Sequence, residues 1–296
     1  NAEAFATITG KGYMPTRIEL GRWRWPVSIA IVFVFLIALG LPLFTLAWQS
    51  FFSNLSQPFM GSPPPATLAN YRYILRYPIF LDAVRTSVVV SAMAATVVVG
   101  LTLVMAWIAL RSASRFAWLL DMLASAPIAI PSVIVGASIL FTYLVIPIGV
   151  YDTIWILLIA YVTLSLPYGM RFASTGITQI HRELEEVAEV SGARIGQVLW
   201  RVLLPLLLPF LLAAWIYVFV LSVRELGASI FLIGPGTAVL ATISLTMWEE
   251  GGSYGAVAAL GILQIVPLLV IVAGLRFLET RVHRRTRATG AKARAA

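Results

Sequence analysis

Long apolar runs alternate with short polar segments along the 296 residues of this chain. Six of the runs contain about 20 residues or more, the length at which an α-helix crosses the hydrocarbon core of a bilayer. They cover residues 26–49, 85–110, 119–147, 153–171, 202–223 and 254–276. The pattern therefore predicts an all-α membrane protein with six transmembrane helices.

A further uncharged stretch, residues 226–248, is also long enough to cross a membrane. Gly227 and the tripeptide Gly234-Pro235-Gly236 interrupt it, and such residues punctuate helices. A seventh span would also carry the basic C-terminal residues to the side of the membrane opposite the other basic segments. We therefore expect an external, re-entrant elbow here.

Prolines inside the apolar runs predict irregular helices, because proline removes a backbone donor and clashes with the preceding turn. The third span carries two of them, Pro127 and Pro131, so we expect a kink or local unwinding there. Similar kinks are expected at Pro167, Pro205 and Pro209.

Composition and charge support a membrane protein and give its expected orientation. Hydrophobic residues make up 60% of the chain and charged residues 11%, and the mean hydropathy is +0.91, whereas a soluble domain has roughly 25% charged residues. Seventeen of the 21 Lys and Arg residues fall on the same side of the six expected spans. Basic residues accumulate on the cytoplasmic side, so we expect both termini and the loop over residues 177–200 to be cytoplasmic.

The longest charged island between two apolar spans is His181–Pro205. Its small, mostly apolar positions recur at helical spacing; they are Leu184, Val187, Ala188 and Ser191. Gly192 follows them and is suited to end a helix, and a second short helix is expected to begin near Ala193. Taken alone, this pattern also fits a solvated amphipathic helix that lies on the membrane surface.

The spacing within this island resembles the EAA loop of the permeases of ATP-binding-cassette (ABC) importers. That family pattern is Glu-Ala-Ala, three residues, Gly, nine residues and Ile-x-Leu-Pro. The matching residues here are Glu186-Val187-Ala188, Gly192 and Val202-x-Leu204-Pro205. Val187 and Val202 depart from the pattern by mild apolar exchanges. The segments Arg224-Glu225-Leu226 and Trp248-Glu249 are in turn similar to the iron(III)-type branch of these permeases.

The resemblance implies a division of the chain and a set of coupling residues. We expect a cytoplasmic lead-in over residues 1–25, a six-span permease domain over residues 26–280 and a basic cytoplasmic tail over residues 281–296. In that family the loop forms a coupling helix that docks on a separate ATPase subunit. The residues expected to couple to the ATPase are Glu185, Glu186, Val187, Ala188, Ser191, Gly192, Ala193, Leu204 and Pro205.

The resemblance also implies the partners and the location. The expected partners are a dimer of ABC ATPase subunits, a second permease half that is identical or homologous, and an extracytoplasmic solute-binding protein. The chain itself binds no cofactor, since ATP and Mg²⁺ belong to the partner ATPase, and it sits in the lipid bilayer of the bacterial cytoplasmic (inner) membrane. Ferric iron is the expected cargo, with phosphonate, polyamine, thiamine or another small solute as alternatives.

Residues typical of other chemistries are missing from the sequence. The interiors of the six expected spans contain no Asp, Glu, Lys, Arg or His, whereas ion-coupled pumps and membrane enzymes carry ionisable groups at depth. The chain has no cysteine and no Walker motif, and His181 and His283 lack neighbouring ligands. We expect no catalytic residue, no metal site and no nucleic-acid partner; an ion-coupled secondary transporter and a membrane enzyme are the alternatives from other classes.

Two adjacent charges, Arg224 and Glu225, lie near the outer end of the fifth expected span. They fit an interfacial ion pair that anchors the end of the span. They also fit a gate at the outer face, where a cargo would arrive. The sequence leaves both interpretations open.

Overall fold

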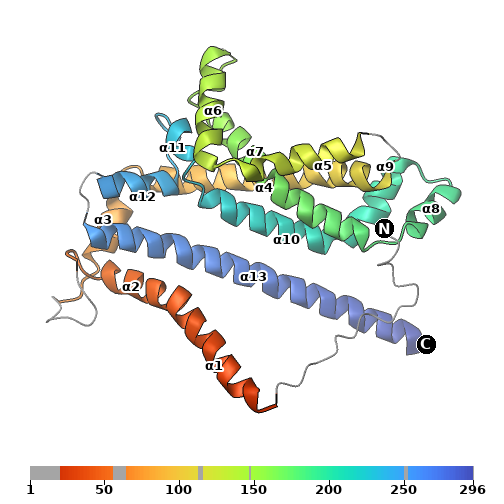
Figure 1. Ribbon diagram of the computed structural model, residues 1–296, viewed down its shortest axis with the longest axis horizontal. Coiled ribbons are helices and arrows are strands. Elements are labelled where there is room, and N and C mark those ends of the chain that lie inside the picture. The colour runs from red at the N-terminus through yellow and green to blue at the C-terminus, as the bar shows by residue number, and fades with distance from the viewer. Residues whose placement is uncertain (1–20, 56–64, 113–115, 147, 250–252, 296) are drawn as a thin grey trace. The chain divides into compact units, whose positions relative to one another are not determined.

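The computed structural model describes residues 21–55, 65–112, 116–146, 148–249 and 253–295, and the described residues form helices without strands (Figure 1). They divide into two compact units. The first comprises Asn1–Ile74 with Gly251–Ile262, and the second comprises Leu75–Glu250 with Leu263–Ala296. Most of the expected lead-in over residues 1–25, and Glu250, lie outside the described residues.

The first unit begins with one long apolar helix. A 3₁₀ turn Gly21–Trp23 leads into α1 (Arg24–Phe35), a π turn Leu36–Gly40 and α2 (Leu41–Ser50). The apolar side chains of α1 are exposed, as expected of a helix surrounded by lipid, since lipid tails are as apolar as these side chains. The π turn ends directly before Leu41-Pro42, where proline leaves the helix one hydrogen-bond donor short.

Asn70, on the short helix α3 (Ala69–Arg76), ties the first unit together. Its Nδ2 donates to the carbonyl oxygens of Ser50 at 2.9 Å and Phe52 at 3.1 Å, and its Oδ1 accepts from the hydroxyl of Ser253 at 3.4 Å. Gly255 lies so close to Phe52 and Asn70 that a Cβ there would overlap them. One buried amide therefore links the end of α2, α3 and the start of α13 (Tyr254–Ala295).

Replacing Asn70 with Ala is expected to destabilise this unit. The substitution removes the Asn70 donor from the buried carbonyls of Ser50 and Phe52, although the carbonyl of Phe52 still accepts from Gln49 Nε2 at 3.2 Å. The loss of these buried hydrogen bonds costs about 2 kcal/mol. Asn54→Ala is the matched control, because Asn54 is exposed and its side chain should contribute little. Thermal unfolding of the two detergent-solubilised variants measures the difference, and equal midpoints would contradict the proposed role of Asn70.

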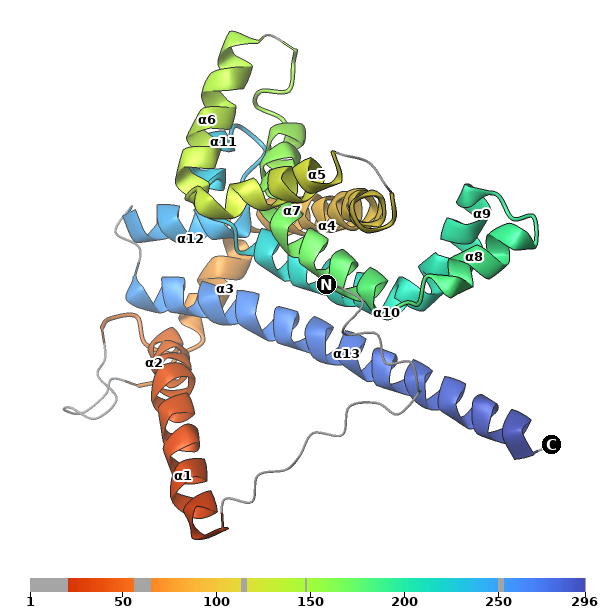
Figure 2. The same ribbon diagram turned by 45° about the vertical axis from the view of Figure 1, so that its right-hand side comes forward.

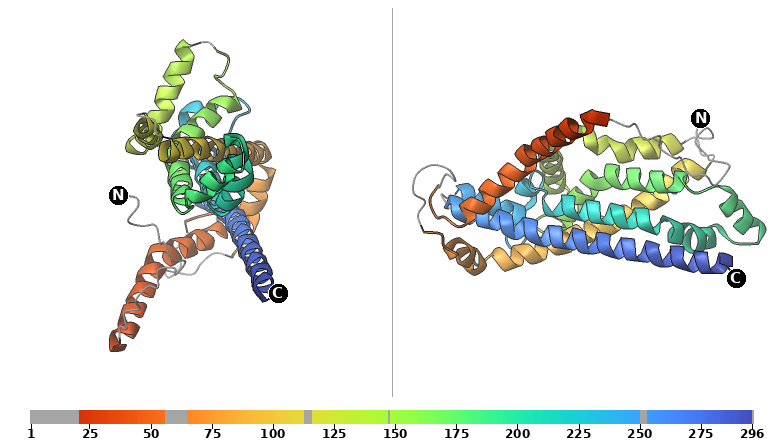
Figure 3. Two further views of the ribbon diagram at one scale, coloured as in Figure 1. Left: turned by 90° about the vertical axis from the view of Figure 1, so that its right-hand side faces the viewer. Right: turned by 90° about the horizontal axis from the view of Figure 1, so that it is seen from below.

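The second unit is built around α4 (Phe80–Arg111), α7 (Ile154–Thr178) and α10 (Leu204–Val223), which run side by side (Figures 1 and 3). Gly169 lets α7 approach α4 closely, since a Cβ there would lie 2.6 Å from Val98 Cγ1 and 2.8 Å from Thr102 Oγ1. Small residues allow such close approach between membrane helices. At one end of the three helices a buried cluster includes Met170, Ala173, Ile177, Leu203, Leu207 and Leu211.

The third expected span is broken. α5 (Ala117–Ser125) continues into a 3₁₀ turn Ala126–Ala129, and after Pro131 the chain resumes as α6 (Ser132–Val145) at an angle of 107° (Figure 1). The expected unwinding between Pro127 and Pro131 is confirmed. In contrast, α7 continues as one helix through Pro167, and α10 continues through Pro209.

Residues 226–248 form no helix of spanning length. They contain α11 (Ser229–Leu232) and the start of α12 (Leu240–Glu249), separated by the turn at Gly234–Gly236. The hydroxyl of Ser87 accepts from the backbone N–H of Leu240 at 2.8 Å and so caps α12 against α4. The interrupted, elbow-like form expected from the sequence is confirmed.

Five described helices are long and apolar enough to cross a membrane, and the bent pair α5–α6 provides a sixth if it counts as one span. The five are Gly21–Ser50, Phe80–Arg111, Ile154–Thr178, Gly196–Val223 and Tyr254–Gly274. These positions agree with the apolar runs, so the fold is that of an all-α membrane protein. α13 continues as a helix from the last span through the expected basic tail to Ala295.

Candidate functional site

The loop between α7 and α10 folds into two short helices. They are α8 (Glu183–Val190) and α9 (Ile195–Val198), and a π turn Leu199–Leu203 connects α9 to α10. Both helices lie beyond the ends of α7 and α10 (Figures 2 and 3). The helix–turn–helix expected over His181–Pro205 is therefore present.

The turn between the two helices depends on Gly192, whose φ is +85°. This is a conformation that side chains with a Cβ rarely adopt. The N–H of Ala193 donates to the carbonyl of Ala188 at 3.0 Å, and the backbone N–H of Arg194 donates to Gln197 Oε1 at 2.9 Å, as in a capping box. Both helix ends at the turn thus find hydrogen-bond partners, which stabilises their relative direction.

α8 presents an apolar surface that the described residues do not cover. Val187 is 65% exposed and Val190 is 91% exposed, and Leu184 and Ser191 are exposed as well. Glu186 is also exposed, and its contact is an ion pair with Arg182 one turn earlier, at 3.4 Å. Exposed apolar residues at helical spacing on a short amphipathic helix are typical of a helix that docks into a groove.

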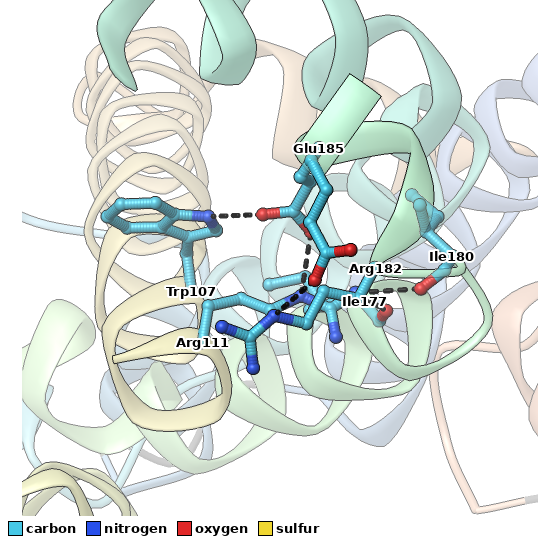
Figure 4. A network of polar contacts seen from close by, with 7 residues as sticks. Trp107, Arg111, Ile177, Ile180, Arg182 and Glu185 are labelled. Atoms are coloured by element: carbon cyan, nitrogen blue, oxygen red, sulfur yellow. Dashed lines mark hydrogen bonds and ion pairs between the residues drawn. The ribbon is translucent and has the colours of Figure 1, made fainter. Parts of the chain in front are cut away.

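Glu185 differs from the other expected coupling residues, because its side chain is only 9% exposed and points inward (Figure 4). Its Oε1 accepts from Arg111 Nε at 2.7 Å, and its Oε2 accepts from Trp107 Nε1 at 3.3 Å. Trp107 and Arg111 are one turn apart on the last part of α4. Glu185 therefore connects α8 to this chain's own α4.

Arg111 also connects α4 to α7. Its Nη2 donates to the carbonyl oxygens of Ile177 at 3.1 Å and Ile180 at 2.7 Å, at the end of α7 (Figure 4). Helix C-termini carry partial negative charge and helix N-termini partial positive charge. The guanidinium thus lies at the C-terminal ends of α4 and α7, and Glu185 lies in the first turn of α8, so both charges are favourably placed.

The sequence interpretation missed the roles of Arg111 and Trp107. In the sequence, Arg111 is one of the basic residues that set the orientation, and an arginine at the end of an apolar run is common. One sequence feature could have indicated these roles. Trp107 and Arg111 are four residues apart, so an N–H donor and a cation lie on one face of α4. That spacing does not identify the carboxylate that they bind.

The connection from α9 into α10 packs on one side against the long helices. Leu203 is fully buried, and Leu204 packs against the same cluster of α4, α7 and α10. Pro205 follows in the first turn of α10, directly after the π turn. The Leu204-Pro205 pair therefore marks the point where the loop joins the packed helices.

Arg224 and Glu225 do not form an ion pair with each other among the described residues. Arg224 is exposed, whereas Glu225 is half-buried and its Oε1 accepts from the N–H of Ala228 at 3.0 Å. Glu225 also lines a cavity of about 240 Å³ between the broken third span, α7 and the end of α10. The described residues contain no group of three His, Cys, Asp or Glu side chains that would hold a metal ion.

Comparison with known families identifies the chain. Residues 99–285, more than half of its length, match the family described as the binding-protein-dependent transport system inner membrane component. The chain belongs to this family. The matched segment contains the loop of α8 and α9, both residues of α4 that bind Glu185, and the cavity at Glu225.

The names of two relatives give different transported solutes. PhnV of Salmonella typhimurium, assigned to a 2-aminoethylphosphonate transport system, is 33% identical over 153 residues, which are 52% of this chain and 58% of PhnV. The ferric transport system permease protein FbpB of Actinobacillus pleuropneumoniae is 30% identical over 57% of this chain and 25% of FbpB. The chain thus matches little more than half of PhnV and a quarter of FbpB.

The fold is also similar to that of a solved structure. The crystal structure of a bacterial alginate ABC transporter, in complex with an alginate pentasaccharide-bound periplasmic protein, contains a chain with a TM-score of 0.68. The similarity covers 87% of this chain and 94% of that chain at 19% identity. The family and the spanning helices together make this a multi-pass inner-membrane protein.

Proposed function

We propose that the chain is the transmembrane permease subunit of an ATP-driven importer that receives its cargo from a solute-binding protein. The observation that carries the proposal is the α8–Gly192–α9 loop, whose exposed apolar side chains have no cover within the described part of the chain. Membership in the binding-protein-dependent family supports the same function.

The proposed mechanism is mechanical. A partner ATPase, which carries ATP and Mg²⁺, holds α8 in a groove and moves it when nucleotide binds or is hydrolysed. The ion pair of Glu185 with Arg111 and the connection through Leu204-Pro205 transmit this movement to α4, α7 and α10. A ligand shifts a conformational equilibrium only through its different affinity for the two states, so the groove must bind α8 differently in each nucleotide state.

The proposed assembly contains further chains. A second six-span half, identical or homologous, completes the translocation pathway, and an extracytoplasmic binding protein delivers the cargo, as the periplasmic protein bound to the alginate transporter supports. The proposed orientation has both termini and α8 in the cytoplasm, following the distribution of Lys and Arg. FbpB favours ferric ion as cargo and PhnV favours a phosphonate, so the proposed cargo is a small solute.

The direct test is to purify the tagged chain from its native membrane in mild detergent. We expect an ATPase with a Walker motif to co-purify, together with ATP hydrolysis. Purification of the intact chain without any ATPase would contradict the proposed function, and uptake driven by an ion gradient without ATP would favour a secondary transporter instead.

Replacing Val187 with Asp is expected to reduce the recovered ATPase about tenfold. The introduced carboxylate would have to be desolvated in the groove that holds α8. Gln179→Asp is the matched control, because Gln179 is exposed at the end of α7 before α8 begins. Equal recovery of ATPase by both variants would show that α8 does not dock through this surface.

A further inference from the structure

The cavity lined by Glu225 has an unusual combination of groups for the inside of a membrane protein. Its volume is about 240 Å³, which is room for a small organic molecule. Glu225 is the single acidic side chain among the described residues that line it, and they include no Lys, Arg or His. A half-buried carboxylate with no cation among the residues that line its cavity is costly.

The carboxylate is only partly satisfied by the protein. Oε1 of Glu225 accepts from the N–H of Ala228, whereas Oε2 has no hydrogen-bond partner among the described residues. Ser222 also lines the cavity, is only 3% exposed, and its buried Oγ has no partner either. In native structures most buried polar groups are paired, so the unpaired hydroxyl of Ser222 indicates that something else binds here, and the second carboxylate oxygen of Glu225 is available as an acceptor in the same cavity.

Tyr161, one of the two tyrosines that line the cavity, adds a hydrogen-bond acceptor. Ser229 Oγ donates its proton to the carbonyl of Glu225 at 2.6 Å, so it can only accept in its contact with Tyr161. Tyr161 must therefore donate to Ser229 at 2.8 Å, which leaves its own oxygen as an acceptor. With Ser165 and Tyr168 on the same helix, the wall provides oxygen acceptors around one negative charge.

The backbone on the facing side is irregular as well. Pro127, Ile128 and Ile130 line the cavity from the break in the third span. Within a membrane, non-helical backbone is tolerated where it lines a cavity or is buried in protein, and broken helices mark the binding sites of many transporters. The cavity thus lies where the helices are interrupted.

We propose that this cavity is a cargo subsite that binds an organic ammonium group, with Glu225 as its counter-ion. An ammonium presents several N–H donors, which match the Oε2 of Glu225 and the surrounding hydroxyl oxygens. A bare metal cation fits less well, because one carboxylate without further His, Asp or Glu ligands cannot complete its coordination. An anion without a positive group would face an uncompensated like charge.

This inference rests on the proposed function and narrows its substrate class. It is tested on the complete importer, containing both halves and the ATPase, in nanodiscs without the binding protein. The probes are radiolabelled putrescine, 2-aminoethylphosphonate, methylphosphonate and ferric citrate, measured by equilibrium dialysis. We expect saturable binding of the two ammonium probes and none of methylphosphonate.

Three variants make the test specific. Glu225→Gln preserves the acceptor for Ala228 but removes the charge, and we expect it to weaken ammonium binding at least about tenfold. Ser222→Ala removes a hydroxyl without leaving any partner unpaired, and we expect about threefold weaker binding. Asp121→Asn removes an exposed carboxylate of α5 outside the cavity and should bind like the unmodified importer.

The outcomes separate this inference from the function on which it rests. Failure of the chain to assemble with an ATPase would overturn the proposed function. An assembled importer that hydrolyses ATP but binds methylphosphonate as well as 2-aminoethylphosphonate would overturn the ammonium subsite alone. Binding of ferric citrate alone, or ammonium binding unaffected by Glu225→Gln, would overturn it equally.

Discussion

Replacing Arg111 with Ala is expected to lower uptake by the assembled importer at least about tenfold while ATP hydrolysis continues. The substitution leaves the buried carboxylate of Glu185 without its partner and the carbonyls of Ile177 and Ile180 without their donor. Breaking a buried pair in this way costs about 3–5 kcal/mol. Because the same side chain joins α8 to α4 and α7, its loss should uncouple the loop from the spans.

A loss of stability alone would also reduce uptake, so a second variant separates the two effects. Arg111→Met combined with Glu185→Leu removes both charges together, and apolar replacement of a whole buried pair is often neutral or stabilising. We expect this double variant to fold and to hydrolyse ATP, yet to remain deficient in uptake. Restored uptake in the double variant would contradict a coupling role for the ion pair.

Arg182→Ala is the matched control for charge removal near the coupling helix. Arg182 forms an ion pair with Glu186 at 3.4 Å, but the two side chains are 67% and 60% exposed. Exposed pairs contribute less than about 1 kcal/mol. We therefore expect near-normal uptake from this variant, and a defect as large as that of Arg111→Ala would argue against a special role for the buried pair.

The second large effect is expected from Gly192→Arg, which should assemble poorly with the ATPase or hydrolyse ATP without uptake. A Cβ at Gly192 would meet no atom within 4 Å, so the cost arises from the backbone, whose φ is +85°. Holding a residue with a Cβ in this conformation costs about 1–2 kcal/mol, and α8 would change its direction relative to α9 to relieve the strain.

Gly196→Arg provides the comparison, because it introduces the same long cation nearby. Gly196 is also exposed, and a Cβ there would likewise meet no atom within 4 Å, but this glycine lies in α9 with ordinary helical geometry. Co-purification of the ATPase and ATP-dependent uptake would be measured for both variants. Equal defects would assign the effect to the added charge and bulk rather than to the turn.

The spans and the turn of the coupling loop could be predicted because they depend on local features. Apolar length predicted the transmembrane helices, and Gly192 predicted the end of α8, since a glycine after an amphipathic run commonly adopts positive φ. The interrupted elbow followed from Gly234-Pro235-Gly236. Each of these features depends on one continuous segment of the chain, from a few residues for the turns to about 20 for a span.

The inward position of Glu185 could not be predicted in the same way. Glu185 and Glu186 are neighbours, and successive helical residues point about 100° apart, so only one of them can face α4. Their chemistry is the same, and the choice depends on where Arg111 lies in the folded chain. The separation of 74 residues between the two partners carries no signal in a single sequence.

The prolines lie in two kinds of surroundings. Pro127 and Pro131 lie one turn apart and break the third span, whereas α7 and α10 continue through Pro167 and Pro209. A single proline removes one donor and costs about 3 kcal/mol, which packing on neighbouring helices can offset. Sequence alone does not reveal such packing, and Pro167 is buried in the folded chain.

The π turn Leu199–Leu203 holds one residue more than an α-helical turn, at the point where the loop enters α10. Moving this extra residue one position along the helix would rotate only the residue that it passes, by about 100°, and would leave the residues on either side in place. Leu207 and Leu211 would therefore keep their packing positions. The turn thus lets a side chain at the base of the loop change its direction without repacking of the span.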